Sequence, residues 1–474
     1  MLKLKIFFFS FLLTLSANSY SQSAKKFEGN WRGVLKVGVE LRIVVYIKED
    51  SLHNFYSTLD SPDQSAFGIK ADETLIKGEE ITISIRNLNA TLTGLLTNDT
   101  TIDGTLTQGS TIPLHLTKSD IVTVLKRPQT PKPPFAYKSE DVEYDNKSKL
   151  LHYGATITIP TGKGPFPAAV LITGSGPQNR DEEIFEHKPF AIIADDLTRN
   201  GFVILRVDDR GVGKSTGIFN LATSEDFAND VNVAVDYLKS RPEVDPKRIG
   251  LIGHSEGGII APIVATQRKD IDYIVLLAAP GIKIDQLMAE QNAAILRSSG
   301  ISEKASLAFQ VMYKEIINQI IHAPDTATAK KAAEASMQKW ISTTDGAVIK
   351  ELKFNDKDGQ REYIKAIIEG LYVPWLRYFL AYDPQPNLKK LNSKVLALNG
   401  SKDLQVISKS NLAGIESSLK KSKSKTFEVK EMEGLNHLFQ RCKTCTVAEY
   451  GQLEESFSPE ALRVIREWLE KNVK

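Results

Sequence analysis

Five short apolar runs in the second part of the chain constrain its fold more than any other feature. Each run stays hydrophobic on both faces, whereas a strand with one face in water alternates apolar and polar residues. Runs of this kind are typical of a parallel sheet that is covered by helices on both sides. Helical stretches such as Ser224 to Lys239 lie between them, so we expect a doubly wound, mostly parallel α/β sheet. The runs are Ala168–Thr173, Phe202–Val207, Ile249–Ile252, Ile274–Leu277 and Val395–Leu398.

The strand pattern stops between Gly281 and Asn392, where the sequence turns helical. About 110 residues is far longer than an ordinary connection between two elements. We therefore expect a helical cap, inserted at about 281–392 over one edge of the sheet. The last helix follows Ser458, Pro459 and Glu460, which supply a capping hydroxyl, a first-turn proline and an acid.

Residues 22–125 read differently, as short strands rich in β-branched and aromatic residues with turn residues between them. Five or more strands in about 100 residues predict a small all-β domain, either a sandwich or a barrel. The proline-rich segment 126–135 is the expected linker, and residues 136–474 form the expected α/β domain. The expected strands are Trp31–Val37, Leu41–Ile47, Ile81–Ile85, Ala90–Leu96 and Ile112–Leu116.

The first 21 residues have the three-part build of a signal peptide. Lys3 and Lys5 precede the apolar run Ile6–Leu15, and small polar residues follow through Ser21. A run of this length is too short to span a bilayer, which takes about 20 residues. We expect export to the periplasm or the medium without a stable membrane anchor, although an N-terminal anchor is the alternative interpretation.

Composition and charge limit the classes of molecule that this protein is expected to bind. The 474 residues carry a net charge of +2 without a long block of one sign, which argues against nucleic acid or an anionic membrane surface. The only cysteines are Cys442 and Cys445, too few for a structural zinc site but compatible with a short-loop disulfide in an exported chain. We expect no metal and no cofactor, and the sequence does not indicate an oligomeric state.

The strongest local motif is Gly253-His254-Ser255-Glu256-Gly257, which follows an expected strand and precedes a helix-compatible stretch. In this context G-x-S-x-G places the serine on a strained turn with its hydroxyl exposed. His254 adjoins Ser255 but is expected to point away and serve in packing.

A serine hydroxyl needs a base to take its proton, and that base needs an acid to orient it. Asp403 follows the expected strand Val395–Leu398, and His437 follows the expected last strand Lys425–Val429. The chain order Ser255, Asp403, His437 is that of an α/β-hydrolase triad. Asp383 is the rival acid, but it precedes its strand.

The tetrahedral intermediate needs two backbone N–H donors. Glu256 supplies the first, and Ser175 or Gly176 in the loop after the first apolar run supplies the second. The segment Asp208–Ser215 ends like a phosphate-binding loop, but it has Asp208 where that motif needs glycine, so we expect a structural turn there.

These residues resemble the α/β-hydrolase superfamily, and more narrowly the secreted bacterial carboxylesterases and serine aminopeptidase S33-type hydrolases with a β-rich N-terminal domain. The resemblance covers about residues 135–474. It implies an α/β-hydrolase fold with Ser255 as nucleophile, His437 as base and Asp403 as acid. Glu256 departs from the small or apolar residue that many relatives have there. The motifs are ITGSGPQNRDE (172–182), DDRGVGKS (208–215), GHSEGG (253–258), LALNGSKDLQV (396–406) and GLNHLFQ (434–440).

The favoured function is a serine esterase acting on a small-molecule ester, of short-chain or acylated-carbohydrate type, through an acyl-enzyme. Trp375, Tyr378 and Phe379 of the cap could wall its acyl pocket, or could equally be cap core. An S33-type aminopeptidase on the same triad is the alternative, with Glu256 or acids of the cap holding the substrate's amino group. A non-catalytic binding protein on a hydrolase scaffold is the third class, and the complete triad argues against it.

Overall fold

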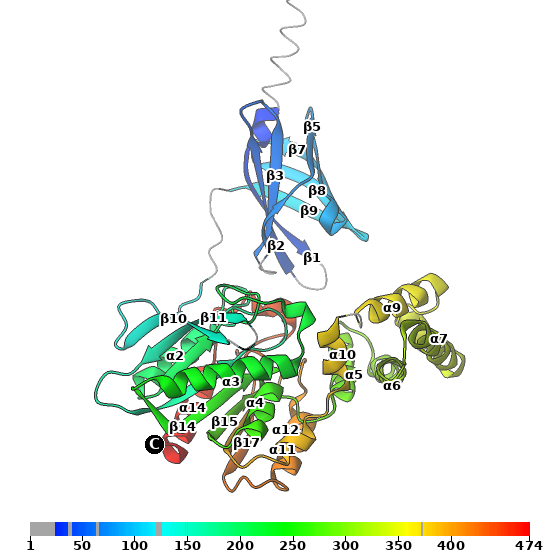
Figure 1. Ribbon diagram of the computed structural model, residues 1–474. Helices are drawn as coiled ribbons and strands as arrows, with labels where there is room; N and C mark the ends of the chain where they lie inside the picture. Colours follow the sequence, from blue (N-terminus) through cyan, green and yellow to red (C-terminus); the bar gives the residue numbers. More distant parts are fainter. Residues whose placement is uncertain are drawn as a thin grey trace, which may run out of the picture. The chain divides into compact units, whose positions relative to one another are not determined.

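The computed structural model describes residues 24–36, 40–62, 66–119, 126–146, 148, 150–370 and 373–474. The expected signal segment, 1–21, lies outside these residues. The chain forms two compact units, which Figure 1 shows in blue to cyan and in green to red. We call residues up to Lys126, with the short segments 184–186 and 448–452, the β unit, and the remainder the α/β unit.

The β unit is one antiparallel nine-stranded sheet in the order β4-β3-β2-β1-β9-β8-β7-β6-β5. The sheet curls on itself, so that strands from its two ends meet. Thr74 Oγ1 of the edge strand β5 donates to Ser57 Oγ at 2.9 Å, and Ser57 belongs to β3, which is second from the other edge. Apolar side chains around the buried Trp31 fill the inside. The strands are β1 Gly29–Lys36, β2 Glu40–Glu49, β3 Phe55–Ser61, β4 Ala66–Lys70, β5 Glu73–Lys77, β6 Glu80–Ile85, β7 Ala90–Asn98, β8 Thr101–Gln108 and β9 Ser110–Lys118.

The expected α/β sheet is confirmed. The α/β unit has eight strands in the order β10-β11-β13-β12-β14-β15-β16-β17, antiparallel at the β10 end and parallel from β13 to β17. All five apolar runs form its central strands. The strands are β10 Lys138–Asn146, β11 Leu151–Ile159, β12 Phe166–Ile172, β13 Val203–Val207, β14 Val244–His254, β15 Ile271–Leu277, β16 Lys394–Gly400 and β17 Phe427–Met432.

Helices cover both faces of this sheet, as Figure 1 shows for the layers around β14 and β15. Side chains of β12 alternate between two cores: Val170 faces the core that contains α3 and α4, and Leu171 faces the core that contains α2 and α14. Burial on both faces explains why the runs show no polar alternation. The covering helices are α2 Pro189–Arg199, α3 Ser224–Ser240, α4 Gly257–Gln267, α12 Ser408–Leu419 and α14 Pro459–Asn472.

The helical insertion lies between β15 and β16, as expected. Its helices pack against one another through buried residues such as Phe309, Met337 and Trp340. These side chains belong to the same continuous core as the α3–α4 side of the sheet. The helices are α5 Ile284–Ser298, α6 Glu303–Ile321, α7 Thr326–Thr343, α8 Gly346–Glu351, α9 Lys357–Gly370, α10 Pro374–Ala381 and α11 Gln385–Leu388.

The proline-rich segment is tied to the α/β unit. The Gln129 side chain donates to the carbonyl of Phe457 at 2.7 Å and accepts the backbone N–H groups of Ser456 and Phe457. Extended proline-rich chain has no internal hydrogen bonds, so its polar groups are free to bind neighbouring backbone. Among the described residues, no helix is both long and apolar enough to cross a membrane.

Helix α14 begins as its sequence indicates, with Ser458 Oγ accepting the N–H of Glu460 and Pro459 in the first turn. Its Ile465 is fully buried against the sheet, whereas Leu462 is half-buried at the margin of the same core. Ile465→Ala therefore leaves a cavity, and we expect it to lower the free energy of unfolding by about 2–5 kcal/mol. Denaturant unfolding followed by circular dichroism measures this loss, and Leu462→Ala should cost clearly less. Equal losses would contradict the placement of the helix.

Candidate active site

The order of the strands creates a crevice at one edge of the sheet. β12 lies between β13 and β14, so the chain leaves β12 toward one side and returns from β13 to the other. At such a reversal the loops after the two neighbouring strands separate, and ligands of open α/β sheets bind in the crevice at the carboxyl ends. The two loops here are the one after β12, which begins with Thr173 and Gly174, and the turn after β14 that holds Ser255.

Ser255 occupies a sharp turn between β14 and α4. Its φ is 51°, a left-handed conformation that costs energy for a residue with a side chain. The neighbouring glycines are required by space: a Cβ on Gly253 would lie 2.1 Å from the carbonyl oxygen of Gly257, and a Cβ on Gly257 would lie 2.2 Å from that of Ile172. Ser255 itself is half-buried, so its hydroxyl lies at a tight, partly open turn.

The expected acid and base are paired. His437 Nδ1 lies 2.8 Å from Asp403 Oδ2, and both side chains are almost completely buried. The other oxygen, Asp403 Oδ1, accepts the backbone N–H groups of Gln405 and Val406 at 2.7 and 2.9 Å. These bonds hold the carboxylate in a fixed orientation toward the imidazole. The His437 ring is 4.9 Å from that of His254, which adjoins Ser255.

The rival acid is placed elsewhere. Asp383 Oδ1 accepts the backbone N–H of Gln385, the first residue of α11.

The expected oxyanion loop lies against the serine turn. A Cβ on Gly174 would be 3.2 Å from Ser255 Cβ. The N–H of Gly174 is already used, because it donates to Glu182 Oε1 at 2.6 Å. In the part of the chain that the structure describes, the N–H groups of Ser175, Gly176 and Glu256 have no protein acceptor. They are therefore available to a bound oxyanion.

Glu256 is a buried carboxylate directly beside the nucleophile turn. Its Oε1 accepts Ser224 Oγ at 2.6 Å, and both of its oxygens accept the indole N–H of Trp375, at 2.9 and 3.0 Å. Burial raises the pKa of Glu256, and hydrogen bonds from Ser224, Trp375 and Ser175 oppose that rise. The carboxylate thus joins the cap to the oxyanion loop and to the start of α3.

The three expected pocket residues of α10 differ in position. Trp375 reaches Glu256 and stacks on Phe379, with ring centroids 5.4 Å apart, while Phe379 is buried as cap core. Tyr378 is beside Tyr382, and burial together with the negative charges of Glu225 and Asp226 raises its pKa. Only Trp375 is brought into contact with a residue of the nucleophile turn.

The segment after β13 braces the oxyanion loop. Asp209 accepts Thr173 Oγ1 and the N–H of Gln178 at the two ends of that loop, and burial raises its pKa to about 8. Asp208 forms a bidentate pair with Arg180 and accepts the N–H of Lys214. The backbone of the loop that resembles a phosphate-binding loop is therefore folded around a carboxylate of its own.

Sequence reasoning missed the role of His254. It packs against His437 as expected, but both of its ring nitrogens are also hydrogen-bonded: Nδ1 lies 2.9 Å from Glu182 Oε1 and Nε2 lies 3.0 Å from the carbonyl oxygen of His437. Glu182 is 72 positions away in the chain, and no local pattern connects the two residues.

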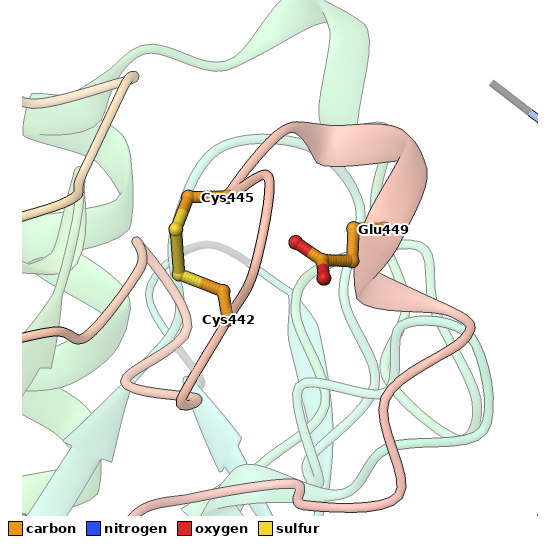
Figure 2. Close-up of side chains that lie close together, drawn as sticks. All are labelled: Cys442, Cys445 and Glu449. Carbon is orange, nitrogen blue, oxygen red and sulfur yellow. A yellow bond between two sulfur atoms is a disulfide. The ribbon is translucent and has the colours of Figure 1, made fainter.

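Cys442 and Cys445 form a disulfide, which Figure 2 shows together with Glu449. The two sulfurs and a carboxylate oxygen of Glu449 lie within 4.8 Å of one another. Metal ions bind cysteine as the thiolate, and sulfurs joined to each other are not thiolates. With the bridge closed, this group offers a metal ion a single anionic side chain.

Comparisons with known proteins fit this geometry. The family described as serine aminopeptidase, S33, matches residues 186–354. Esterase EstD of Thermotoga maritima is 34% identical over 158 residues, which are 33% of this chain and 37% of that protein. Acyl-coenzyme A thioesterase 3 of Mus musculus is 30% identical over 125 residues, 26% of this chain and 25% of that enzyme.

The chain is therefore similar, over part of its length, to the serine aminopeptidase S33 family and to an esterase. It spans between a quarter and about half of the length of the curated relatives that it matches. Among solved structures, an esterase of Pyrococcus furiosus aligns with 71% of this chain and 92% of its own, at 15% identity and a TM-score of 0.43.

The close packing at the nucleophile turn can be tested with one methyl group. Gly257→Ala places a Cβ against the Ile172 carbonyl, so we expect the free energy of unfolding to fall by about 3 kcal/mol and ester hydrolysis to fall with it. Gly346→Ala is the control, because a Cβ there meets no atom within 4 Å. Denaturant unfolding and initial rates measure both effects, and a fully stable, active Gly257→Ala protein would contradict the geometry.

The link between Trp375 and Glu256 can be tested by removing one N–H. Trp375→Phe keeps an aromatic ring but leaves the buried carboxylate with fewer donors, so we expect kcat/KM to fall about tenfold. Trp340→Phe is the matched control, because its indole N–H donates to the carbonyl of Ala308 inside the cap. Similar small effects of the two variants would mean that the Trp375–Glu256 bond does not support the site.

Proposed function

We propose that this protein is a serine carboxylesterase that works through an acyl-enzyme, with Ser255 as nucleophile, His437 as base and Asp403 as acid. The observation that carries the proposal is the buried His437–Asp403 bond of 2.8 Å, on a ring 4.9 Å from that of His254, which directly precedes a serine held at φ 51°. A carboxylate that orients an imidazole next to a strained, half-exposed serine is the arrangement that nucleophilic acyl transfer requires.

In the proposed mechanism Ser255 Oγ attacks the ester carbonyl carbon while His437 Nε2 takes the hydroxyl proton. Asp403 holds the Nδ1–H and stabilises the imidazolium that forms. The negative oxygen of the tetrahedral intermediate accepts N–H groups from Glu256 and from Ser175 or Gly176. His437 then gives its proton to the leaving alkoxide, and the acyl group stays on Ser255. Water, deprotonated by His437, releases the acid and restores the serine.

A cavity of about 50 Å³ lies between the sheet and α3. Apolar side chains such as Phe227 and acidic ones such as Asp209 line it together with Gly174, whereas Ser255 and His437 are not among its lining residues. We propose short-chain esters, including acylated carbohydrates, as the substrate class. The names of these two curated relatives, an esterase and an acyl-coenzyme A thioesterase, support hydrolysis of an ester or thioester bond.

The S33 family description keeps an aminopeptidase in consideration. Such an enzyme needs a carboxylate to bind the substrate's ammonium group, and Glu256 is the acid nearest the nucleophile. Its oxygens already accept Ser224 and Trp375, and it is 1% exposed. A buried carboxylate that already accepts several hydrogen bonds has little capacity to bind a substrate's ammonium group. This favours the esterase over the aminopeptidase.

We also propose that residues 1–21 direct export. The Cys442–Cys445 disulfide supports this, since disulfides persist mainly in oxidising compartments outside the cytosol.

The function is tested by comparing substrates. We expect the protein to hydrolyse p-nitrophenyl acetate and butyrate faster than the octanoate, and aminoacyl p-nitroanilides not at all. Ser255→Ala should lower the rate by about 10⁴- to 10⁶-fold, because the remaining groups only bind and stabilise charge. Ser298→Ala, at an exposed serine in α5, should keep the full rate. Ester turnover that survives in Ser255→Ala would overturn the mechanism, and anilide cleavage would make the protein an aminopeptidase.

A further inference from the structure

A buried pair of titratable side chains lies between the parts of the proposed site. His254 is 6% exposed and Glu182 is 4% exposed. Glu182 Oε1 accepts the N–H of Gly174 at 2.6 Å and lies 2.9 Å from His254 Nδ1. His254 Nε2 lies 3.0 Å from the carbonyl oxygen of His437. One chain of hydrogen bonds therefore runs from the oxyanion loop, through the residue before the nucleophile, to the backbone of the base.

The chemistry of the partners assigns the protons. A carbonyl oxygen can only accept, so His254 Nε2 carries a hydrogen and donates it to His437. The other nitrogen faces a carboxylate oxygen that already accepts from Gly174. The raised pKa of His254 favours a hydrogen on Nδ1 as well, donated to this oxygen, so we take His254 as an imidazolium.

The surroundings favour this charged pair. Burial alone disfavours the imidazolium, but the charge of Glu182 and the hydrogen bonds that the ring donates to Glu182 and to the His437 carbonyl outweigh it, so the pKa of His254 is raised. Asp403, in the loop after β16, adds a further favourable negative charge. On the other side Asp209 faces Glu182 as a like charge. The ring of His437 completes the surroundings of His254.

We infer that His254 and Glu182 are positioning residues. Their ion pair fixes three segments relative to one another: the loop that contains Gly174, the turn that contains Ser255 and the loop that contains His437. The inference rests on the proposed function, because it assigns these two residues a role in the same site. Neither residue touches the reacting atoms. Their effect is geometric, since a displacement of about 1 Å among reacting groups can cost about 100-fold in rate.

Glu182→Gln tests the pair sharply, because an amide cannot replace the carboxylate here. If its oxygen accepts from Gly174, the neighbouring His254 must donate through Nδ1, and a neutral ring then has no hydrogen left for His437. If its nitrogen faces His254 instead, that nitrogen meets the N–H of Gly174 as a second donor. One of the three bonds is lost in either arrangement.

The control is Glu183→Gln, one position along the chain. Glu183 is half-buried and interacts with Asn179 and Lys188 near the surface. It has the same change of charge but no bond to the catalytic elements, so we expect the wild-type rate. A second variant, His254→Gln, removes the imidazolium and retains an amide that can donate to the His437 carbonyl.

The rates are measured on p-nitrophenyl acetate and divided by the fraction of enzyme that a fluorophosphonate labels at Ser255. We expect kcat of Glu182→Gln and His254→Gln to fall by about 10- to 100-fold with KM changed less than threefold. A purely structural role would lower the labelled fraction and leave the rate per labelled enzyme unchanged.

The pH profile gives an independent readout. The pair's extra proton is bound below the raised pKa of His254 and is lost as the pH rises through it, so wild-type kcat should decline on the alkaline side. In Glu182→Gln the carboxylate, the strongest opposition to the burial of His254, is gone, so we expect the pKa of His254 to fall and the ring to be neutral over the alkaline range. The alkaline decline of kcat should therefore be absent from this variant. At high pH wild type has also lost the ion pair, so the two proteins should then have the same melting temperature.

The outcomes separate the two claims. Loss of turnover in Ser255→Ala, with wild-type kcat per labelled enzyme and an unchanged alkaline limb in both pair variants, would overturn the positioning role alone. Full turnover in Ser255→Ala would overturn the proposed function first.

Discussion

The close approach of three backbone segments at the end of β14 is the constraint on which the rest of the site depends. There the first turn of α4 passes close to Gly253, the end of β12 close to Gly257 and Ala279 close to Gly258, so that no side chain fits at these glycines. This contact forces Ser255 into its left-handed conformation and sets the loop after β12 directly against it. The position of the oxyanion donors follows from how tightly two neighbouring strands and one helix can pack.

Buried carboxylates hold the oxyanion loop in that position. Asp209 binds its two ends, Glu182 binds Gly174, and Glu256 binds the cap and the start of α3. Burial raises the pKa values of Asp209 and Glu256, and the negative charges of Glu182 and Glu256 add to the rise for Asp209. Each acid is surrounded by donors, and removing a donor leaves a buried charge without compensation. The region is therefore sensitive to single substitutions.

The sequence predicts the α/β unit well and the β unit only partly. Continuous apolar runs such as Val395–Leu398 indicate buried strands because both faces of that sheet are covered. In the β unit β4 and β8 lack such a signal: β8 contains Asp103 and Gly104, and its exposed side chains are polar. Its strand character comes from pairing with β7 and β9 on both sides, which no local pattern contains.

The same distinction applies to the candidate site. Ser255, Asp403 and His437 follow strands in a recognisable order, so their positions could be predicted from the chain. The bonds of Glu256 to Trp375 and of His254 to Glu182 could not, because they join residues 119 and 72 positions apart that meet only in the folded sheet.

The way in which the cap joins the sheet has a consequence for the evolution of such enzymes. The cap leaves after β15 and returns into β16, and these two strands are direct parallel neighbours, with Leu277 opposite Leu398. The insertion can therefore be shortened to a single crossover helix, or exchanged for another, without altering the order of the strands. Changes in the cap are thereby separated from the loops that hold Ser255, Asp403 and His437, and selection can act on the cap while that arrangement is preserved.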